Sequence, residues 1–220
     1  MLAILFDVDD TLYDVSIPFC AACDQVFREK YPISSTNLFL AGRKHDIPVV
    51  DRIRKAFLSY GIELTQAEVM QFHDVYRVEQ SKIRLTEGSK EILDFCRERD
   101  IFTGVITNGF SRPQWNKVKQ LGLEAWIPKD RIIVSGDEGV RKPDPEIFEL
   151  AQKRFGLDRK ETWFIGDTYA TDISGAIKAG WNNIWFNRRQ DELPDKGKQP
   201  DYTVSDERQL LYILKTECTR

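Results

Sequence analysis

The chain has 220 residues, of which 41% are hydrophobic, 30% are charged and 11% are aromatic. This composition excludes a disordered chain, a collagen-like repeat and a small disulfide scaffold, because it supplies enough apolar side chains for a core and enough charge for a hydrated surface. The 32 Lys and Arg residues against 35 Asp and Glu residues leave a net charge of -3. We therefore expect no nucleic-acid partner, since the overall positive field that attracts a phosphate backbone is absent.

The first apolar segment, Leu2–Phe6, is followed at once by Asp7. It is too short for the apolar region of a secretion signal or for a membrane span. We expect a buried strand in a cytoplasmic protein that makes no membrane contact. The pair Cys20 and Cys23 has no second pair at the spacing of zinc ligands, so we interpret it as part of an apolar helix face.

Short apolar segments rich in β-branched and aromatic residues recur along the chain, and helical patterns separate them from the second segment onward. The predicted strands are Leu2–Phe6, Phe102–Thr107, Ile132–Val134, Trp163–Ile165, Ile184–Phe186 and Tyr202–Val204. This alternation predicts an α/β fold: a Rossmann-like, three-layer α/β/α core around a parallel sheet. One of its helices is expected to begin with Asp144 as N-cap and Pro145 as first residue, and to end before Gly156.

Roughly a hundred residues separate the first strand from the second, whereas a whole βαβ unit takes about 30. The excess predicts an inserted helical cap domain at residues 15–82, with the core formed by residues 1–14 and 83–220. Thr65 and Glu68 have capping-box spacing before an apolar stripe. Two connections would join the insertion to the core, and such a pair can act as a hinge. Two further helix faces are predicted there, one with Ile17, Cys20, Ala21 and Phe27, the other with Val50, Ile53 and Phe57.

Polar residues follow the predicted strands at the points where each strand ends. In an open parallel sheet these carboxyl ends share one edge, and ligands bind there. The residues expected at this edge are Asp7, Asp9, Thr107, Asn108, Lys142, Asp167 and Asp172.

The only obvious cation among these residues is Lys142. The several carboxylates would therefore repel one another in a partly dehydrated cleft without a further compensating ion. The candidate ligands are all oxygen atoms, and neither His45 nor His73 lies nearby in sequence. Mg²⁺ is therefore favoured over zinc or copper. Because Mg²⁺ commonly shares a phosphate, we expect the ligand to be a small phosphorylated metabolite, with Thr107, Asn108 and Lys142 supplying phosphate donors.

A carboxylate on a rigid strand end can attack phosphorus, which gives Asp7 the role of nucleophile. Asp9, two residues further along, can protonate the leaving oxygen and later deprotonate water. Lys142 would offset charge on the phosphoryl oxygens. Asp167 is expected to bind the metal directly, and Asp172 directly or through water.

Four ordered motifs resemble those of the haloacid dehalogenase superfamily, and the match covers nearly the whole chain. They are Asp7-Val8-Asp9-Asp10-Thr11-Leu12, Thr107-Asn108-Gly109, Lys142-Pro143-Asp144-Pro145, and Gly166-Asp167 with Asp172. The resemblance implies a metal held by the side chains of Asp7 and Asp167 and by the backbone carbonyl of Asp9. It also implies membership of the subgroup whose helical cap follows the first motif, similar to nucleoside 5'-monophosphate and phosphoglycolate phosphatases.

The sequence thus predicts a Mg²⁺-dependent phosphatase acting on a nucleoside monophosphate, phosphoglycolate or a sugar phosphate. A dehalogenase is disfavoured, because a departing halide needs no proton and Asp9 would be superfluous. A phosphomutase uses the same four elements and stays open, as does a regulatory or binding protein that keeps the fold without the chemistry. The role of Asp10, the individual substrate and the choice between monomer and homodimer are also open.

Overall fold

The computed structural model describes residues 1–43 and 49–217. It divides into two compact units, one formed by Met1–Asp14 with Arg84–Arg220 and the other by Val15–Ile83. His45 and Cys218 lie outside the described residues, as does the side chain of Val50.

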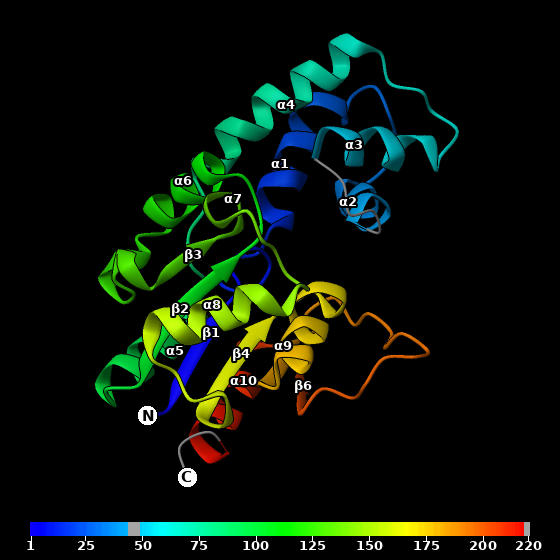
Figure 1. Cartoon of the computed structure of the whole chain (residues 1–220). Helices are drawn as coiled ribbons and strands as arrows, with labels where there is room; N and C mark the ends of the chain where they lie inside the picture. The colour runs from blue at the N-terminus through cyan, green and yellow to red at the C-terminus, as the bar shows by residue number, and fades with distance from the viewer. Residues whose placement is uncertain (44–48, 218–220) are drawn as a thin grey trace. The chain divides into compact units, whose positions relative to one another are not determined.

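The first unit is built on a six-stranded sheet in which every pair of neighbouring strands is parallel (Figure 1). The strands are β1 (Ala3–Phe6), β2 (Phe102–Thr107), β3 (Ile132–Val134), β4 (Thr162–Gly166), β5 (Asn182–Phe186) and β6 (Tyr202–Val204). They coincide with the predicted strands apart from small differences at their ends. The predicted parallel α/β core is confirmed.

The strand order, β3-β2-β1-β4-β5-β6, places β1 in the interior of the sheet, between β2 and β4. The chain first adds β2 and β3 on one side of β1 and then crosses to β4 on the other side. All four residues of β1 are buried, as expected for a strand covered on both faces. Such a reversal is a topological switch point, where the connections leave a crevice beyond the carboxyl ends of the strands.

Helices cover both faces of the sheet, and those of this unit are α5 (Glu87–Glu98), α6 (Ser111–Leu121), α7 (Ser135–Glu138), α8 (Pro145–Phe155), α9 (Ser174–Ala179) and α10 (Glu207–Thr216). On one face α8 and α9 pack Phe148 and Ala176 against Leu5 and Phe164 of the sheet. On the other side lies α10, drawn in red behind the strands in Figure 1, and α5 packs beside it.

The predicted limits of α8 are confirmed by its caps. The Asp144 carboxylate accepts a hydrogen bond from the backbone N–H of Glu146 at 3.0 Å, and Pro145 is the first helical residue. Gly156 ends the helix with a φ of 66°, a left-handed conformation that glycine adopts without a Cβ clash. Local sequence therefore sets both ends of this helix.

In the described part of the second unit, residues 15–43 and 49–83, there are four helices, α1 (Ser16–Phe27), α2 (Ser35–Arg43), α3 (Val49–Leu58) and α4 (Gln66–Gln80). The predicted capping box at the start of α4 is present, with Thr65 and Glu68 bonded to each other's backbone N–H groups. Aromatic rings fill the core, where Phe72 packs against Phe19 and Phe27.

The predicted apolar face of α1 is wrong at Ile17, whose side chain is 67% exposed. The buried face is formed instead by Phe19, Ala22, Cys23 and Phe27. Two neighbouring apolar stripes run along this helix, and packing against α2 and α4 decides which one is buried. Cys23, interpreted as core, is buried.

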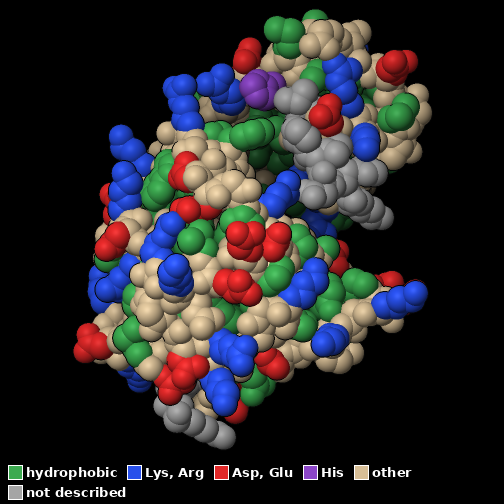
Figure 2. All heavy atoms as spheres, viewed as in Figure 1, with side chains coloured by type: hydrophobic (Ala, Val, Ile, Leu, Met, Phe, Trp, Pro, Cys, Tyr) green, Lys and Arg blue, Asp and Glu red, His purple; other side chains and the backbone are tan. Residues whose placement is uncertain are grey.

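The surface of the molecule is mixed in charge. On the face shown in Figure 2, Lys and Arg side chains and Asp and Glu side chains are interspersed, as expected from the net charge of -3. Within residues 1–43 and 49–217, no helix combines the length and the apolar character needed to cross a bilayer.

Replacing Phe72 by Ala should lower the free energy of unfolding by about 3–5 kcal/mol, because the ring is fully buried among other rings and the cavity would remain partly empty. Urea denaturation followed by circular dichroism measures this loss. Met70→Ala on the same helix is the control, since that side chain is 57% exposed and should change stability by less than about 0.5 kcal/mol. Equal effects of the two substitutions would contradict the assignment of this core.

Candidate active site

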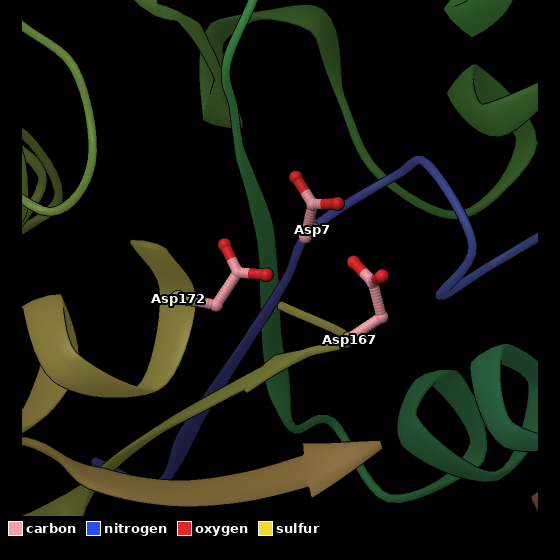
Figure 3. A group of neighbouring side chains, drawn as sticks. All are labelled: Asp7, Asp167 and Asp172. Atoms are coloured by element: carbon pink, nitrogen blue, oxygen red, sulfur yellow. The ribbon is translucent and has the colours of Figure 1, made fainter. Parts of the chain in front are cut away.

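Three aspartates meet at the carboxyl end of the sheet beside the switch point. Asp7 directly follows β1, Asp167 directly follows β4, and Asp172 lies in a short π-helical turn, Tyr169–Ile173. One carboxylate oxygen from each lies within 4.8 Å of the others, and Figure 3 shows the three side chains as neighbours. The predicted strand-end residues Asp7, Asp167 and Asp172 are therefore close together.

The backbone around these aspartates is fixed by the sheet. The N–H of Asp7 donates to the carbonyl of Ile165 at 2.8 Å, which extends the pairing of β1 with β4 by one residue. The indole N–H of Trp185 on β5 donates to the carbonyl of Asp167 at 2.7 Å. Both carboxylates therefore stand on rigid strand ends rather than on a free loop.

Gly166 makes room for Asp172. A Cβ at this glycine would lie 2.5 Å from Cγ of Asp172, closer than two carbon atoms can approach. The carboxylate of Asp172 passes over the glycine and accepts a hydrogen bond from the N–H of Thr168 at 2.9 Å. A glycine is therefore needed at position 166 because the Asp172 side chain occupies the space of a Cβ, and not because of the backbone angles of Gly166.

Lys142 lies in the centre of the site and is only 1% exposed. Its Nζ donates to Asp7 Oδ1 at 2.7 Å, to Asp172 Oδ1 at 2.7 Å and to the carbonyl of Ile106 at 2.8 Å. An ammonium group has three hydrogens, so all of its donors are used. Burial disfavours its charge, but attraction to Asp172 and Asp7 outweighs burial and raises the pKa of Lys142.

Asn108 holds the backbone of Lys142. Its side-chain N–H₂ donates to the carbonyl of Lys142 at 2.9 Å, and its side-chain oxygen accepts from the N–H of Lys142 at 3.0 Å. The side chain predicted to bind phosphate is therefore engaged in placing the lysine. A phosphate contact through the backbone of Asn108 stays a prediction.

The site carries an excess of negative charge. Burial raises the pKa of Asp7 to about 7, opposed by Lys142 and supported by Asp172 and Asp9. Burial, followed by Asp172, Asp10 and Asp7, raises the pKa of Asp167 well above its usual range. Three carboxylates face one ammonium, so two negative charges are left without a partner when all groups are ionised.

This arrangement fits a divalent cation. A single divalent ion would balance the charge left by the four groups, and oxygen ligands suit Mg²⁺. Among the described residues of the site, Asp167 has the least compensated carboxylate, which accepts a hydrogen bond from the hydroxyl of Thr168 at 3.1 Å. The carboxylate of Asp9 does not belong to the group of three, and metal binding through its backbone carbonyl remains a prediction.

Asp9 is turned toward α6. Both of its carboxylate oxygens accept hydrogen bonds from Nζ of Lys117, each at 2.6 Å, and the Tyr13 hydroxyl and the Gln114 side chain also donate to it. Burial opposes ionisation of this carboxyl, but the Lys117 ammonium and the hydrogen bonds outweigh burial and lower the pKa of Asp9. Asp9 is therefore an ionised carboxylate in the free protein.

Thr107 ends β2 and is 1% exposed. Its hydroxyl oxygen accepts a hydrogen bond from the Gln114 side chain at 2.6 Å. Gly109 gives that side chain its space, since a Cβ there would lie 2.8 Å from Cγ of Gln114. The loop after β2 is thus wrapped around a buried glutamine.

Asp10, left open from the sequence, is buried and has a positive φ of 58°. Arg189, which follows β5, donates to both of its carboxylate oxygens at 2.9 and 2.7 Å and also contacts Asp14. Such a bidentate pair supports the unusual backbone of Asp10. Arg189 thus holds Asp10 in the turn that carries Asp9.

Sequence reasoning missed four residues of the site: Tyr13, Gln114, Lys117 and Arg189. A partial signal existed for two of them, because Gln114 and Lys117 are three residues apart and share one face of a helix that starts at the end of β2. Arg189 falls in a polar loop, and nothing in its neighbourhood distinguishes it from Arg188.

Replacing Gly166 by Ala should displace Asp172 and abolish thermal stabilisation by Mg²⁺, because the new Cβ would overlap that side chain. Differential scanning fluorimetry with MgCl₂ and with chelator measures the shift in Tm. Gly88→Ala is the control, since its Cβ would meet Glu207 at 2.4 Å, in a contact between α5 and α10. The control should lose stability yet keep its response to Mg²⁺. An unchanged response in Gly166→Ala would contradict the metal assignment.

The raised pKa of Asp7 predicts that metal-free protein loses stability as the pH rises. The folded state holds this proton up to about pH 7 and the unfolded state only to about 3.8, so the stabilisation is complete at low pH and is lost through that window. Urea denaturation in chelator should show wild type losing about 1–3 kcal/mol more than Asp7→Asn between about pH 5 and 8. Asp130→Asn, at an exposed position, should follow wild type, and parallel curves for all three proteins would refute the prediction.

A family model described as haloacid dehalogenase-like hydrolase matches residues 1–180. A glyceraldehyde 3-phosphate phosphatase of Pyrococcus furiosus is 29% identical over 228 residues, covering 97% of this chain and 93% of that protein. A pyrimidine 5'-nucleotidase of Escherichia coli is 38% identical over 112 residues, or 50% of this chain and 48% of that protein. The crystal structure of a HAD-hydrolase of Bacillus subtilis bound to magnesium has the same fold, with a TM-score of 0.71 at 23% identity over 97% of this chain and 98% of that one.

Proposed function

The chain belongs to the haloacid dehalogenase-like hydrolase family, and we propose that it is a Mg²⁺-dependent phosphatase that hydrolyses a small phosphomonoester through a phosphoryl group carried on Asp7. The observation that carries this proposal is the grouping of Asp7 with Asp167, Asp172 and the buried ammonium of Lys142. Relatives named as a triose phosphate phosphatase and as a pyrimidine nucleotidase support a sugar phosphate or a nucleotide as substrate.

In the first step an oxygen of the Asp7 carboxylate attacks phosphorus and the bond between phosphorus and the ester oxygen breaks. Asp9, which is ionised in the free protein, takes up a proton from solvent when the ester binds and gives it to the departing oxygen, so that an alcohol leaves rather than an alkoxide. Lys142 orients Asp7 and opposes the rise in its pKa, since it bonds Asp7 Oδ1 at 2.7 Å.

In the second step water attacks the phosphorus of the phosphoryl-aspartate. The Asp9 carboxylate takes a proton from that water, the bond between phosphorus and Asp7 breaks, and inorganic phosphate leaves. The lowered pKa of Asp9 favours the ionised form that this step requires. In this proposal Thr107 donates its hydroxyl hydrogen to a phosphoryl oxygen.

Asp7 and Asp167 would hold the cation, with Asp172 bound directly or through water, and magnesium in the Bacillus subtilis relative supports this choice. When bound, Mg²⁺ supplies positive charge that reduces repulsion between the phosphoryl oxygens and the attacking carboxylate.

We also propose that the helical unit is a cap that selects the substrate, since the strand ends contact the phosphoryl group common to all candidates. Within that unit a cavity of about 50 Å³ is lined by Phe19, Phe39, Arg43, Arg52 and Tyr76 with two valines. Aromatic and cationic groups together suit a leaving group that has a planar or an anionic part.

Asp7→Asn should lower phosphate release by at least about 1,000-fold, because an amide oxygen is a poor nucleophile. Phosphate release is measured on glyceraldehyde 3-phosphate, pyrimidine nucleoside monophosphates, phosphoglycolate and hexose phosphates, with Mg²⁺ and with chelator. Asp130→Asn is the control and should match wild type.

Undiminished turnover of Asp7→Asn would refute the covalent mechanism, and turnover in chelator would refute the metal requirement. A wild-type protein that accumulates phosphoryl-Asp7 without releasing phosphate would indicate transfer to a second metabolite, as in a mutase. No reaction with any ester would instead favour a binding protein.

A further inference from the structure

The contacts around Asp9 come from side chains outside the four sequence motifs. Lys117 and Gln114 lie one turn apart on α6 and both reach the Asp9 carboxylate. We propose that Lys117 and Gln114 are positioning residues, which hold Asp9 in the orientation from which it exchanges protons with the ester oxygen and with water. This inference rests on the proposed function and assigns these two residues a part in its proton transfers.

The first argument is the geometry of the ion pair. A solvent-exposed ion pair orients its partners poorly and contributes about 0–1 kcal/mol. Here the Lys117 ammonium bonds both carboxylate oxygens at 2.6 Å, and the side chains of Lys117 and Asp9 are 16% and 34% exposed. With the Tyr13 hydroxyl on one oxygen and Gln114 on the other, the carboxylate plane is held from several directions.

The second argument is that Gln114 joins two functional positions. Its side-chain nitrogen lies 2.6 Å from the Thr107 hydroxyl oxygen and 3.2 Å from Asp9 Oδ2, and Gln114 is 3% exposed. One amide group therefore sets where the proton-transfer carboxylate stands relative to the phosphate-binding hydroxyl. Because the Thr107 hydroxyl accepts this bond, its own hydrogen stays available for a phosphoryl oxygen.

The third argument compares the effects expected of contacts that only stabilise the packing of α6 with those expected of contacts that position Asp9. Contacts that only attach α6 to the sheet edge would change stability, or change all reactions alike. Contacts that place a proton donor change only the steps in which a proton moves, since proton transfer depends on the distance and alignment of the donor. The leaving group of the substrate separates the two cases.

An alkyl phosphate releases a strongly basic alkoxide and needs the proton of Asp9, whereas 4-nitrophenyl phosphate releases a stable phenolate and needs it far less. Because kcat/KM reports the phosphorylation of Asp7, it isolates this step. For Lys117→Met we expect kcat/KM to fall about tenfold or more with the best alkyl phosphate of the panel, and less than about threefold with 4-nitrophenyl phosphate.

Lys117→Arg keeps the cation and should recover part of the loss. Gln114→Met should show the same selectivity together with a raised KM, because Thr107 loses its partner, and it tests the inference should Lys117→Met fail to fold. Lys119→Met, at an exposed position on the same helix, removes the same charge and should match wild type. Thermal denaturation of each variant records any structural effect.

Equal losses with both esters, or no loss with either in any folded variant, would overturn the positioning role while leaving the proposed function intact. A wild-type protein that releases phosphate from neither ester would overturn the proposed function and this inference with it.

Discussion

The buried ammonium of Lys142 is the constraint on which the rest of the site depends. An unpaired charge at this depth would cost several kcal/mol, yet all three of its hydrogens are bonded, two of them to Asp7 and Asp172. These partners arrive from β1 and from the turn after β4. Together with its bond to Ile106 on β2, the lysine therefore connects three segments at the carboxyl end of the sheet: the end of β1, the end of β2 and the turn after β4.

Neighbouring features follow from placing that lysine. Asn108, directly after β2, binds both the backbone N–H and the backbone carbonyl of Lys142. Gly166 lets Asp172 reach the ammonium, because any side chain there would occupy the same space. Residues that look like four separate motifs along the sequence thus form one hydrogen-bonded assembly around a single cation, and the negative charge left uncompensated there suits a divalent cation.

The aspartates of the site fall into two groups that differ in the direction in which their pKa values are shifted. Asp7 and Asp167 have raised pKa values, because burial and neighbouring carboxylates disfavour their ionised forms. Asp9, only two residues from Asp7, has a lowered pKa, because the charge of Lys117 and hydrogen bonds from Lys117, Tyr13 and Gln114 outweigh the effect of burial. Groups of one chemical type thus acquire different proton affinities from the helix or strand against which each side chain lies.

The sequence by itself determined the strands, the limits of helices such as α8 and the chain positions of Asp7, Thr107, Lys142, Asp167 and Asp172, because periodicity, caps and strand ends are local properties. Only the tertiary structure decided that Gln114 and Lys117 reach Asp9, that Arg189 holds Asp10, that Asn108 serves Lys142, and that α1 buries Phe19 rather than Ile17. Lys117 lies 108 positions from Asp9 and Arg189 lies 179 from Asp10. Such pairs leave no periodic trace in the sequence, since the packing of helices on the sheet sets which side chains meet.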